Sequence, residues 1–388
     1  MQTLTQSPTD PAFVQNPYPF YARARASGDL FHWDDYAMPM ACSAASVNAI
    51  LRDRRFGREA VEPLVIPDHL TDFYRVEEHS MLELEPPRHT RLRGLVLRAF
   101  TSRKIKELAP DIDALSHQLI DAFPEGEFDL LPRFAQHLPV IIIARLLGVP
   151  EEMSDQLLSW SNAMVRMYIP GRSRADEDAA NAAARDFTTF LRGYIEARRN
   201  DPRDDLITSL IAAEEDGERL STDELITTCI LTLNAGHEAT VHTIGNGVKA
   251  LLEAGLGWPA DTDAAVEEIM RYDPPLHMFT RYVYEEVEVF GHTFQRGDRV
   301  GLLLASANHD AALWDRAEVF DPTRAAKPHA AFGGGLHFCV GAPLARLELQ
   351  RALPVLFARC PGLALVGTPE YADSYHFHGL SRLMVRAA

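Results

Sequence analysis

One stretch decides how the rest of the chain is interpreted: Phe332-Gly333-Gly334-Gly335-Leu336-His337-Phe338-Cys339-Val340-Gly341, followed directly by an amphipathic run that begins at Pro343. The glycines allow a tight backbone turn and a close approach to a flat ligand. Cys339 ends this turn just before a predicted helix, whose first N–H groups, those of Val340 and Gly341, can stabilise a thiolate. A buried free cysteine is usually an inert core residue, but such a residue needs no combination of glycine turn, aromatic shield and nearby cation. The string therefore indicates a thiolate held against a metal.

The same string resembles the haem-binding loop of the cytochromes P450, whose pattern is Phe-Gly-x-Gly-x-His/Arg-x-Cys-x-Gly, and it meets every fixed position. The resemblance implies that Cys339 is the axial ligand of the iron in haem b, and that Phe332, His337 and Gly341 also lie at the cofactor. An axial thiolate pushes electron density onto the iron and favours O–O cleavage. The implied activity is that of a monooxygenase that uses O₂.

Composition sets the class of protein. The chain has 388 residues, 46% of them hydrophobic and 24% charged, which is ordinary for a soluble globular protein. Helical patterns dominate, and no linker, repeat or low-complexity tract marks a domain boundary. We therefore expect one domain over residues 1–388, with a flexible N-terminal tail over about residues 1–15. The resemblance implies the mainly α-helical cytochrome P450 fold with small β-sheets.

Charge and cysteine content exclude several classes of partner. The net charge of -17, from 38 basic and 55 acidic residues, argues against binding to nucleic acid. The first residues form no apolar signal region, and no run approaches the roughly 20 apolar residues of a membrane span. Four cysteines without a CxxC pair indicate a reducing compartment. We expect a cytoplasmic protein that does not bind membranes.

A basic stretch stands out on this acidic chain. Between Arg88 and Lys106 there are seven basic residues and no acidic one: Arg88, Arg91, Arg93, Arg98, Arg103, Lys104 and Lys106. Such a stretch is a candidate docking site for an acidic partner or an anionic ligand. The alternative is an ordinary solvated helix face.

Periodic apolar positions and polar punctuation place the secondary structure. They predict helices over 16–25, 88–100, 111–123, 132–147, 151–165, 176–199 and 223–253, and short strands near 31–40, 282–289 and 299–304. The helix from 223 begins at a capping box, Ser221 with Glu224, and spans about 45 Å. A helix of that length would cross the whole molecule.

The middle of this helix departs from its apolar pattern at Asn234-Ala235-Gly236-His237-Glu238-Ala239-Thr240. Glycine inside a helix costs up to about 1 kcal/mol, and a buried carboxylate costs more unless it is paired. Such penalties tend to persist at functional sites. The segment resembles the Ala-Gly-x-Asp/Glu-Thr motif of the P450 distal helix. The alternative is a packing contact at Gly236 with an exposed Glu238.

The resemblance makes Glu238, Ala239 and Thr240 the candidate catalytic residues, with Glu238 delivering protons. Most members carry a threonine directly after the acid, whereas here Ala239 follows and the hydroxyl comes one place later, at Thr240. One residue turns a helix by about 100°, so Thr240 should not simply replace the missing group. We expect an ordered water or a polar group of the substrate to supply that hydrogen bond. The alternative for Thr240 is a bond to the backbone carbonyl one turn back.

Further motifs of the resemblance place supporting residues. Glu268-Ile269-Met270-Arg271 matches Glu-x-x-Arg, and Phe320-Asp321-Pro322-Thr323-Arg324 supplies a third charge. Together Glu268, Arg271 and Arg324 are implied to form a structural triad. Haem propionates need cations and N–H donors, for which Arg is well suited. The implied residues are His89, Arg93, Arg281 and His337.

The implied substrate pocket is mostly apolar, which favours a hydrophobic small organic substrate. Its candidate residues are Ile66, Phe73, Met81, Leu82, Trp160, Met164, Tyr168, Leu231, Asn234, Ala235, Leu276, His277, Met278, Phe279, Phe377 and Leu380. Electrons are implied to come from a ferredoxin and its reductase, or from a flavodoxin-type donor. A peroxide-driven peroxygenase and a haem-binding sensor without turnover are the other functions open, although Glu238 argues against the sensor and no Arg-Pro pair replaces the acid, as it does in peroxide-using members.

Overall fold

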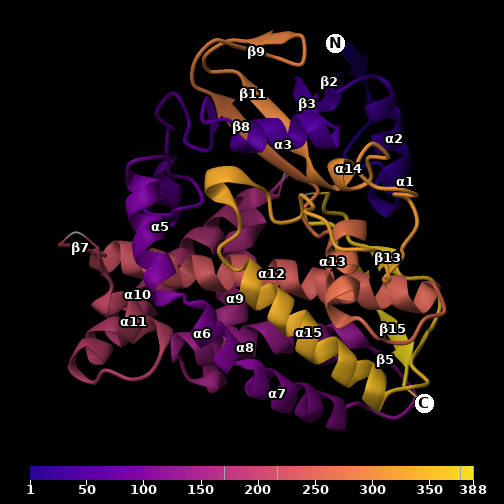
Figure 1. Cartoon of the computed structure of the whole chain (residues 1–388). Helices are drawn as coiled ribbons and strands as arrows, with labels where there is room; N and C mark the ends of the chain where they lie inside the picture. The colour runs from indigo at the N-terminus through magenta and orange to yellow at the C-terminus, as the bar shows by residue number, and fades with distance from the viewer. Residues whose placement is uncertain (170, 216, 376, 388) are drawn as a thin grey trace.

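Helices form most of the molecule and surround one long helix, α12 (Thr222–Glu253), which crosses it as predicted. The computed structural model describes residues 1–169, 171–215, 217–375 and 377–387. The capping box is present, because Ser221 accepts from the N–H of Glu224 and Glu224 accepts from the N–H of Ser221. Helices α8 (His137–Leu147), α9 (Ser154–Val165) and α10 (Arg174–Asn200) pack against α12. Figure 1 shows α15 (Ala342–Arg359) crossing in front of these helices.

The remaining helices are α1 (Pro11–Gln15), α2 (Tyr18–Ala26), α3 (Ala44–Arg52), α4 (Thr71–Glu77), α5 (Arg88–Ala99), α6 (Ser102–Glu107), α7 (Ala109–Asp121), α11 (Leu206–Ala212), α13 (Thr262–Tyr272) and α14 (Leu304–Asn308). The mainly α-helical fold and all seven predicted helices are confirmed. Two segments are divided into two helical elements each. The basic stretch forms two helices, because the backbone leaves α5 at Phe100 and Thr101 caps α6. The helix expected over 132–147 starts with a π-helical turn, Leu131–Ala135, before α8.

A six-stranded sheet lies at one end of the molecule, at the top of Figure 1. Its order is β1 (Gln2–Leu4), β2 (Leu30–Trp33), β3 (Met38–Ala41), β11 (Arg299–Leu303), β8 (Met278–Val283) and β4 (Phe56–Gly57). The β1–β2 and β3–β11 pairs are parallel and the others antiparallel. The strand expected over 31–40 is the pair β2 and β3, joined by a turn, and that over 282–289 divides into β8 and β9 (Val287–Val289).

The small sheets tie distant parts of the chain together. A three-stranded sheet joins β12 (Ala364–Leu365), β15 (Met384–Arg386) and β5 (Glu127–Asp129), and the two-stranded sheets are β9 with β10 (His292–Phe294), β13 (Glu370–Tyr371) with β14 (Leu380–Arg382), and β6 (Glu214–Glu215) with β7 (Glu218–Arg219). Hydrogen bonds of β15 to β5 bring the C-terminal segment beneath α12.

The expected flexible tail over residues 1–15 is wrong for most of this segment. Gln2 to Leu4 pair with β2, and Asp10 caps α1 by accepting from the N–H of Phe13 (2.9 Å). The ring of Phe13 is buried and meets those of Phe20 and Trp33 edge to face. The polar composition of this segment did not indicate that it is ordered, because one buried aromatic ring and one strand are enough to hold it in place.

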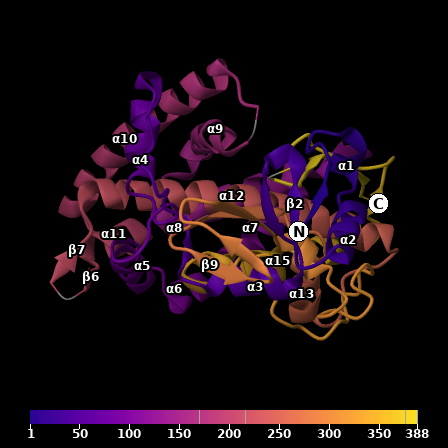
Figure 2. The same cartoon turned by 90° about the horizontal axis from the view of Figure 1, so that it is seen from above.

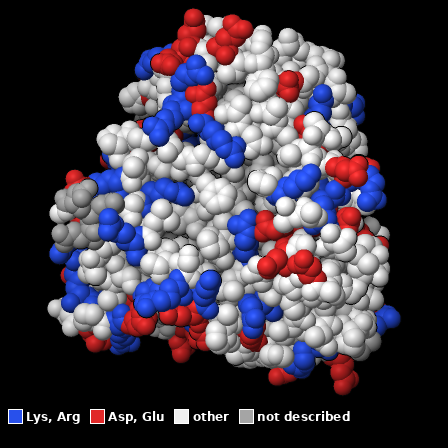
Figure 3. Space-filling view, in the orientation of Figure 1, with Lys and Arg blue, Asp and Glu red and all other residues white. Residues whose placement is uncertain are grey.

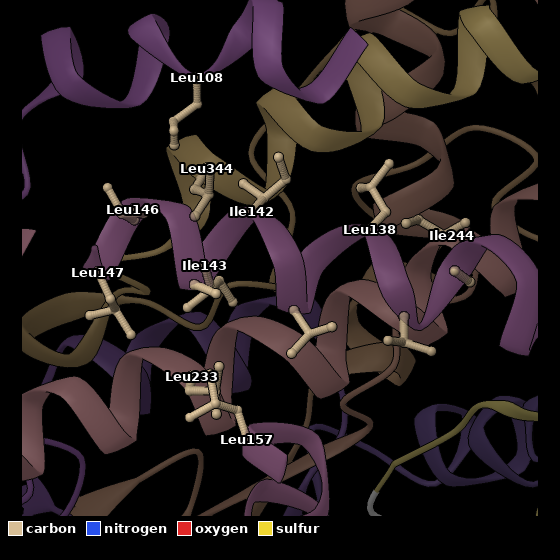
Figure 4. Packing of buried hydrophobic residues seen from close by; sticks show 14 of the residues in the cluster. Leu108, Leu138, Ile142, Ile143, Leu146, Leu147, Leu157, Leu233, Ile244 and Leu344 are labelled. Carbon is tan, nitrogen blue, oxygen red and sulfur yellow. The ribbon is translucent and has the colours of Figure 1, made fainter. Parts of the chain in front are cut away.

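The main core lies between α8, α12, α9 and α15. Figure 4 shows Ile143 and Leu147 of α8 directed toward α12 and α9, where Leu233 and Leu157 lie, with Leu344 of α15 on the other side of α8. All five side chains are buried. This packing fixes α12 relative to α15, which is the geometry on which the candidate site depends. None of the helices that the structure describes is long and apolar enough to cross a membrane.

Candidate functional site

The glycine turn before Cys339 is pressed against the end of α3. Gly333 and Gly335 have φ angles of +67° and +66°, in the left-handed region that favours glycine. A Cβ at position 335 would overlap the carbonyl oxygen of Leu51. The N–H of Cys339 donates to the carbonyl of Phe332 (3.1 Å), which closes the turn. Glycine at position 335 therefore lets the turn contact α3, which a side chain at this position would prevent.

The sulfur of Cys339 lies at the N-terminus of α15, as predicted, and accepts hydrogen bonds from the N–H groups of Gly341 and Ala342. These donors lie one residue further along than the expected pair. Burial raises the pKa of the Cys339 thiol, while the two N–H groups and then Arg93 and Arg346 oppose the rise. A thiol in this setting binds as the thiolate when a metal cation supplies the remaining positive charge.

The aromatic shield is asymmetric. The guanidinium of Arg346 lies over the ring of Phe332, 4.6 Å from its centroid, and donates to Glu267 (2.5 Å). Phe338, in contrast, is 40% exposed. Phe338 therefore shields the sulfur only weakly, and Phe332 is the better-held of the two rings.

Two of the predicted propionate ligands are buried in a way that fits a missing anion. His89 of α5 is 1% exposed, and neither ring nitrogen has a hydrogen-bond partner among the described residues. Arg281 of β8 is 3% exposed and donates to the carbonyl of Thr280 (2.9 Å); burial, and then Arg58, lowers its pKa to about 10. Buried donors without acceptors are costly. An anionic group would accept from His89 and be stabilised by the buried cation of Arg281, so these residues fit the haem propionates.

The other two predicted propionate ligands already have partners. The Nε2 of His337 lies 2.9 Å from Oε1 of Glu85, and its ring lies 4.4 Å from that of His89. Arg93 donates to the carbonyl of Phe338 (2.6 Å), beside the cysteine. Glu85 was not predicted from the sequence, although its position just before Pro86-Pro87-Arg88-His89 indicates that it lies near His89. His337 and Glu85 therefore act as a pair next to His89.

The central helix has one open side. Leu231, Ala235 and Ala239 are spaced four residues apart and are half-buried or exposed, whereas Leu233 and His237 are buried. Gly236 faces α8, where a Cβ would lie 2.9 Å from Cδ1 of Ile143. The packing alternative is thus correct for Gly236, while the open side belongs to residues of the predicted pocket and to Ala239.

Glu238 is half-buried and lies between two histidines. Its Oε1 is 3.1 Å from Nε2 of His242, and its Oε2 is 3.7 Å from Nδ1 of His237. Burial raises the pKa of Glu238, but His242 and then His237 outweigh it, so the net shift is downward. These groups line a cavity of about 160 Å³ with residues of α9, among them Asn162. The alternative of an ordinary exposed Glu238 is wrong.

Thr240 does not reach the open side of α12. Its hydroxyl donates to the carbonyl of Gly236 (2.8 Å), which is the alternative bond, and lies against the carboxyl of Glu348 in α15. Glu348 is buried, which raises its pKa to about 8, and the bond from Thr240 opposes that rise. In this geometry the Thr240 hydroxyl faces α15 and not the open side of α12. Ala239 leaves the expected position without a hydroxyl.

The predicted charge triad is present, and two of its members, Glu268 and Arg271, are buried. Arg271 donates to both carboxylate oxygens of Glu268 (2.7 and 2.8 Å), and Nε of Arg324 lies 3.3 Å from the same carboxylate. Arg271 also donates to the carbonyls of Asn308, Ala317 and Val319. These contacts hold the segment that precedes the Cys339 turn.

The predicted pocket residues divide into three groups. Those that remain partly open are Met81, Leu82, Trp160, Tyr168, Leu231, Ala235, Leu276, Phe279 and Phe377, and a β-bridge joins Leu276 to Phe377. Those that are buried are Phe73, Met164, Asn234, His277, Met278 and Leu380. Ile66 is 47% exposed on a loop. Met278 belongs to the core around Phe13 and Trp33, and His277 bonds the hydroxyl of Tyr21 (2.8 Å), so the structure contradicts their placement as pocket walls.

The basic stretch is partly neutralised by its own fold. Arg91 pairs with Glu224, and Lys104 bonds Asp204 (3.1 Å) and Ser209 (2.7 Å). Arg98, Arg103 and Lys106 are exposed on α5 and α6. Figure 3, which views the molecule from the side of α15, shows basic side chains around an uncharged area near the middle of this face. A surface of this kind suits an acidic protein.

Comparisons with known proteins agree with this geometry. Residues 262–361 match the family model described as Cytochrome P450. The chain is 37% identical to "Cytochrome P450 monooxygenase PikC" of Streptomyces venezuelae over 96% of this chain and 92% of that protein. It is 38% identical to "Vitamin D(3) 25-hydroxylase" of Pseudonocardia autotrophica, over 96% and 94%. The solved structure of P450BioI with a ligated acyl carrier protein superposes with a TM-score of 0.91 at 33% identity, over 97% of this chain and 99% of that one.

Proposed function

The chain belongs to the cytochrome P450 family, whose members are haem-thiolate monooxygenases that bind haem b, and from this premise we propose that it oxidises a hydrophobic small organic substrate. One atom of O₂ enters the substrate and the other leaves as water, with two electrons and two protons taken up. The observation that carries the proposal is the combination of Cys339, held by two N–H groups, with the unpaired ring of buried His89 and the buried cation of Arg281.

Residues of the Cys339 loop, of α5 and of β8 together hold the cofactor. Cys339 ligates the iron as thiolate, and Gly341 and Ala342 hold the charge on the sulfur. His89 and Arg281 bind the propionates, while Glu85 orients His337 beside them. Bound haem supplies the activation of O₂.

Glu238 carries protons from the cavity behind α12 to the open side of the helix. Its carboxylate is held by His242 and faces a cavity of about 160 Å³, large enough for several waters. Because Ala239 has no hydroxyl and Thr240 is bonded to Gly236, an ordered water or a polar group of the substrate completes the relay. Glu238 then exchanges protons with that group while His242 fixes its position.

Members of the family use O₂ and redox partners, and a ferredoxin with its reductase is the donor that this surface favours. The exposed cations of α5 and α6 lie near the Cys339 turn, since Arg93 of α5 touches Phe338. A flavodoxin-type protein carries similar acidic charge and is the other candidate donor.

The test is the spectrum of the reduced protein with CO. Wild type should show the red-shifted Soret band of a thiolate-ligated haem, and Cys339→Ser should lose it. Cys360→Ser is the matched control, because Cys360 is buried at the other end of α15. Retention of the band in Cys339→Ser would transfer the role of ligand to another residue.

A further inference from the structure

We propose that Glu77 forms a subsite for a positively charged nitrogen, so that the preferred substrates are hydrophobic amines that are cationic at neutral pH. This inference rests on the proposed monooxygenase function and adds the class of substrate. It concerns four residues that the predicted haem and catalytic roles leave aside: Arg58, Glu77, Glu83 and Tyr168.

Glu77 is the last residue of α4, a helix that is fixed at both ends. Figure 2 shows α4 next to α10, against which it packs. At its start, Oδ1 of Asn181 in α10 accepts from the N–H groups of Asp72 (2.8 Å) and Phe73 (3.0 Å). At its end, the carbonyl of Val76 accepts from the hydroxyl of Thr227 in α12 (3.3 Å). Thr227 lies one helical turn before Leu231, so the end of α4 lies against the part of α12 that leads to its open side.

The position of Glu77 is unfavourable for an anion. The C-terminus of a helix carries partial negative charge, which disfavours a carboxylate. The hydroxyl of Tyr168 donates to Oε1 of Glu77 (3.0 Å). Burial and then Glu83 raise the pKa of Glu77 to about 8, although Tyr168 and Arg58 oppose the rise. A carboxyl group that destabilises the fold in this way is retained more readily where a ligand pairs with it.

The nearby cation is already occupied. Arg58 forms an ion pair with Glu83, and its Nε donates to the carbonyl of Leu82 (3.2 Å). Glu85, which accepts from the backbone N–H of Arg58, is paired with His337. With Arg281, the other nearby cation, assigned to the propionates, Glu77 is left without a cation of its own, and a cationic ligand would stabilise its carboxylate.

The surroundings favour an organic cation over a metal ion. The rings of Phe73 and Tyr168 lie next to Glu77 with centroids 6.4 Å apart, and aromatic faces attract alkylammonium groups. Leu82, whose carbonyl accepts from Arg58, is apolar and half-buried. A carboxyl group with aromatic neighbours selects a cation, and the apolar residues select its hydrocarbon part.

The experiment compares matched ligand pairs on the haem-loaded enzyme. The probes are hexyl-, octyl- and decyltrimethylammonium ions and the neutral compounds in which a tert-butyl group replaces trimethylammonium, each with a terminal hydroxyl for solubility. A quaternary nitrogen cannot ligate iron. Dissociation constants come from calorimetry and from the Soret shift. We expect the best cation to bind at least about tenfold more tightly than its neutral partner, a factor that corresponds to about 1.4 kcal/mol.

Glu77→Gln should abolish this preference, and Glu78→Gln, one residue on and exposed, should retain it. Glu77→Leu is a second variant that removes the charge with a change of shape. The proposal is overturned if no cation of the series binds more tightly than its neutral partner, or if both Glu77 variants keep the preference. The CO band of every variant is recorded first: its loss concerns Cys339 and the proposed function, whereas an intact band with no charge preference concerns Glu77 alone.

Discussion

The backbone of Gly379 lies directly against the imidazole ring of His242, so closely that a Cβ at position 379 would overlap the ring. His242 in turn holds Glu238 (3.1 Å). The C-terminal turn thus positions the proposed proton carrier through a histidine that the family motifs do not include.

Gly379→Ala should displace His242 and destabilise the protein by about 1–3 kcal/mol, as overpacking of a core usually does. Urea unfolding measures the change. Gly193→Ala is the matched control, because Gly193 is exposed within α10 and has open space at its Cβ. That change should be neutral or stabilise by up to about 1 kcal/mol. Equal stability of Gly379→Ala and wild type would show that the turn moves away freely.

Gly335→Ala should lower haem content. A Cβ there would meet the carbonyl oxygen of Leu51, and the φ of +66° is strained for alanine. The turn must then leave α3 and carry Cys339 with it. The ratio of haem to protein after reconstitution, measured at equal protein concentration, should fall at least several-fold. Gly257→Ala, with nothing near its Cβ, should retain full content.

Stability should fall as pH rises from about 6.5 to about 8, in part through Glu348. Below about pH 6.5 the buried histidines oppose this fall, because burial lowers the pKa of groups such as His309 and His378 to about 3. The pKa of Glu348 rises on folding from 4.5 to about 8, so the folded chain retains a proton that the unfolded chain has released in this window. The contribution is fully present below the unfolded pKa and is lost as pH rises through the folded one. Each such group contributes a slope of about 1.4 kcal/mol per pH unit.

Glu348→Gln should flatten the plot of unfolding free energy against pH within this window. A residual slope should remain, because Glu77 has a similarly raised pKa. If the slopes of the variant and wild type coincide, Glu348 is ionised in the folded protein.

Ala239→Thr should improve the coupling of NADH use to product formation with apolar surrogate substrates. The new hydroxyl would lie on the open side of α12, where the relay lacks one. Glu238→Gln should slow turnover with every substrate by about 10²-fold or more, the usual range for general acid catalysis. Product formed per NADH consumed is the measurement. Thr240→Val should change stability rather than coupling, and a loss of coupling in that variant would restore Thr240 as the working hydroxyl.

Electron transfer from a ferredoxin should slow as salt increases, since the Debye length falls from about 10 Å at 0.1 M to about 3 Å at 1 M. Arg98→Glu and Lys106→Glu should slow it further at low salt. Lys104→Glu is a poor probe, because Lys104 bonds Asp204 and Ser209 within the fold. Arg174→Glu, on the exposed start of α10, is the control. If the stopped-flow rates change with neither salt nor charge reversal, the docking surface lies elsewhere.

Local patterns predicted the parts of the site that depend on a few adjacent residues. The Cys339 turn, the capping box at Ser221 and the pair of Glu268 with Arg271 follow from short spacings. The role of Thr240 was harder to predict. The sequence shows where Thr240 lies around the axis of α12, but not that the carboxyl of Glu348 faces it.

Contacts between distant segments could not be predicted. Met278 follows the Pro274-Pro275 pair and is apolar, which fits a pocket wall as well as the core that it joins. The partner of Lys104 lies 100 residues along the chain, and that of Arg91 lies still further. Apolarity and charge indicate that a residue needs a partner, and only the folded chain decides which one.

The hydrogen-bonding capacity of Arg271 is used up inside the fold: two carboxylate oxygens and three backbone carbonyls accept from it. Lysine has three donors on a single nitrogen and cannot reach five acceptors arranged around a planar fork. A replacement that conserves charge is consequently no milder here than one that removes it. Engineers who vary this scaffold for new substrates should treat position 271 as immutable and direct diversity to the walls of the open side of α12.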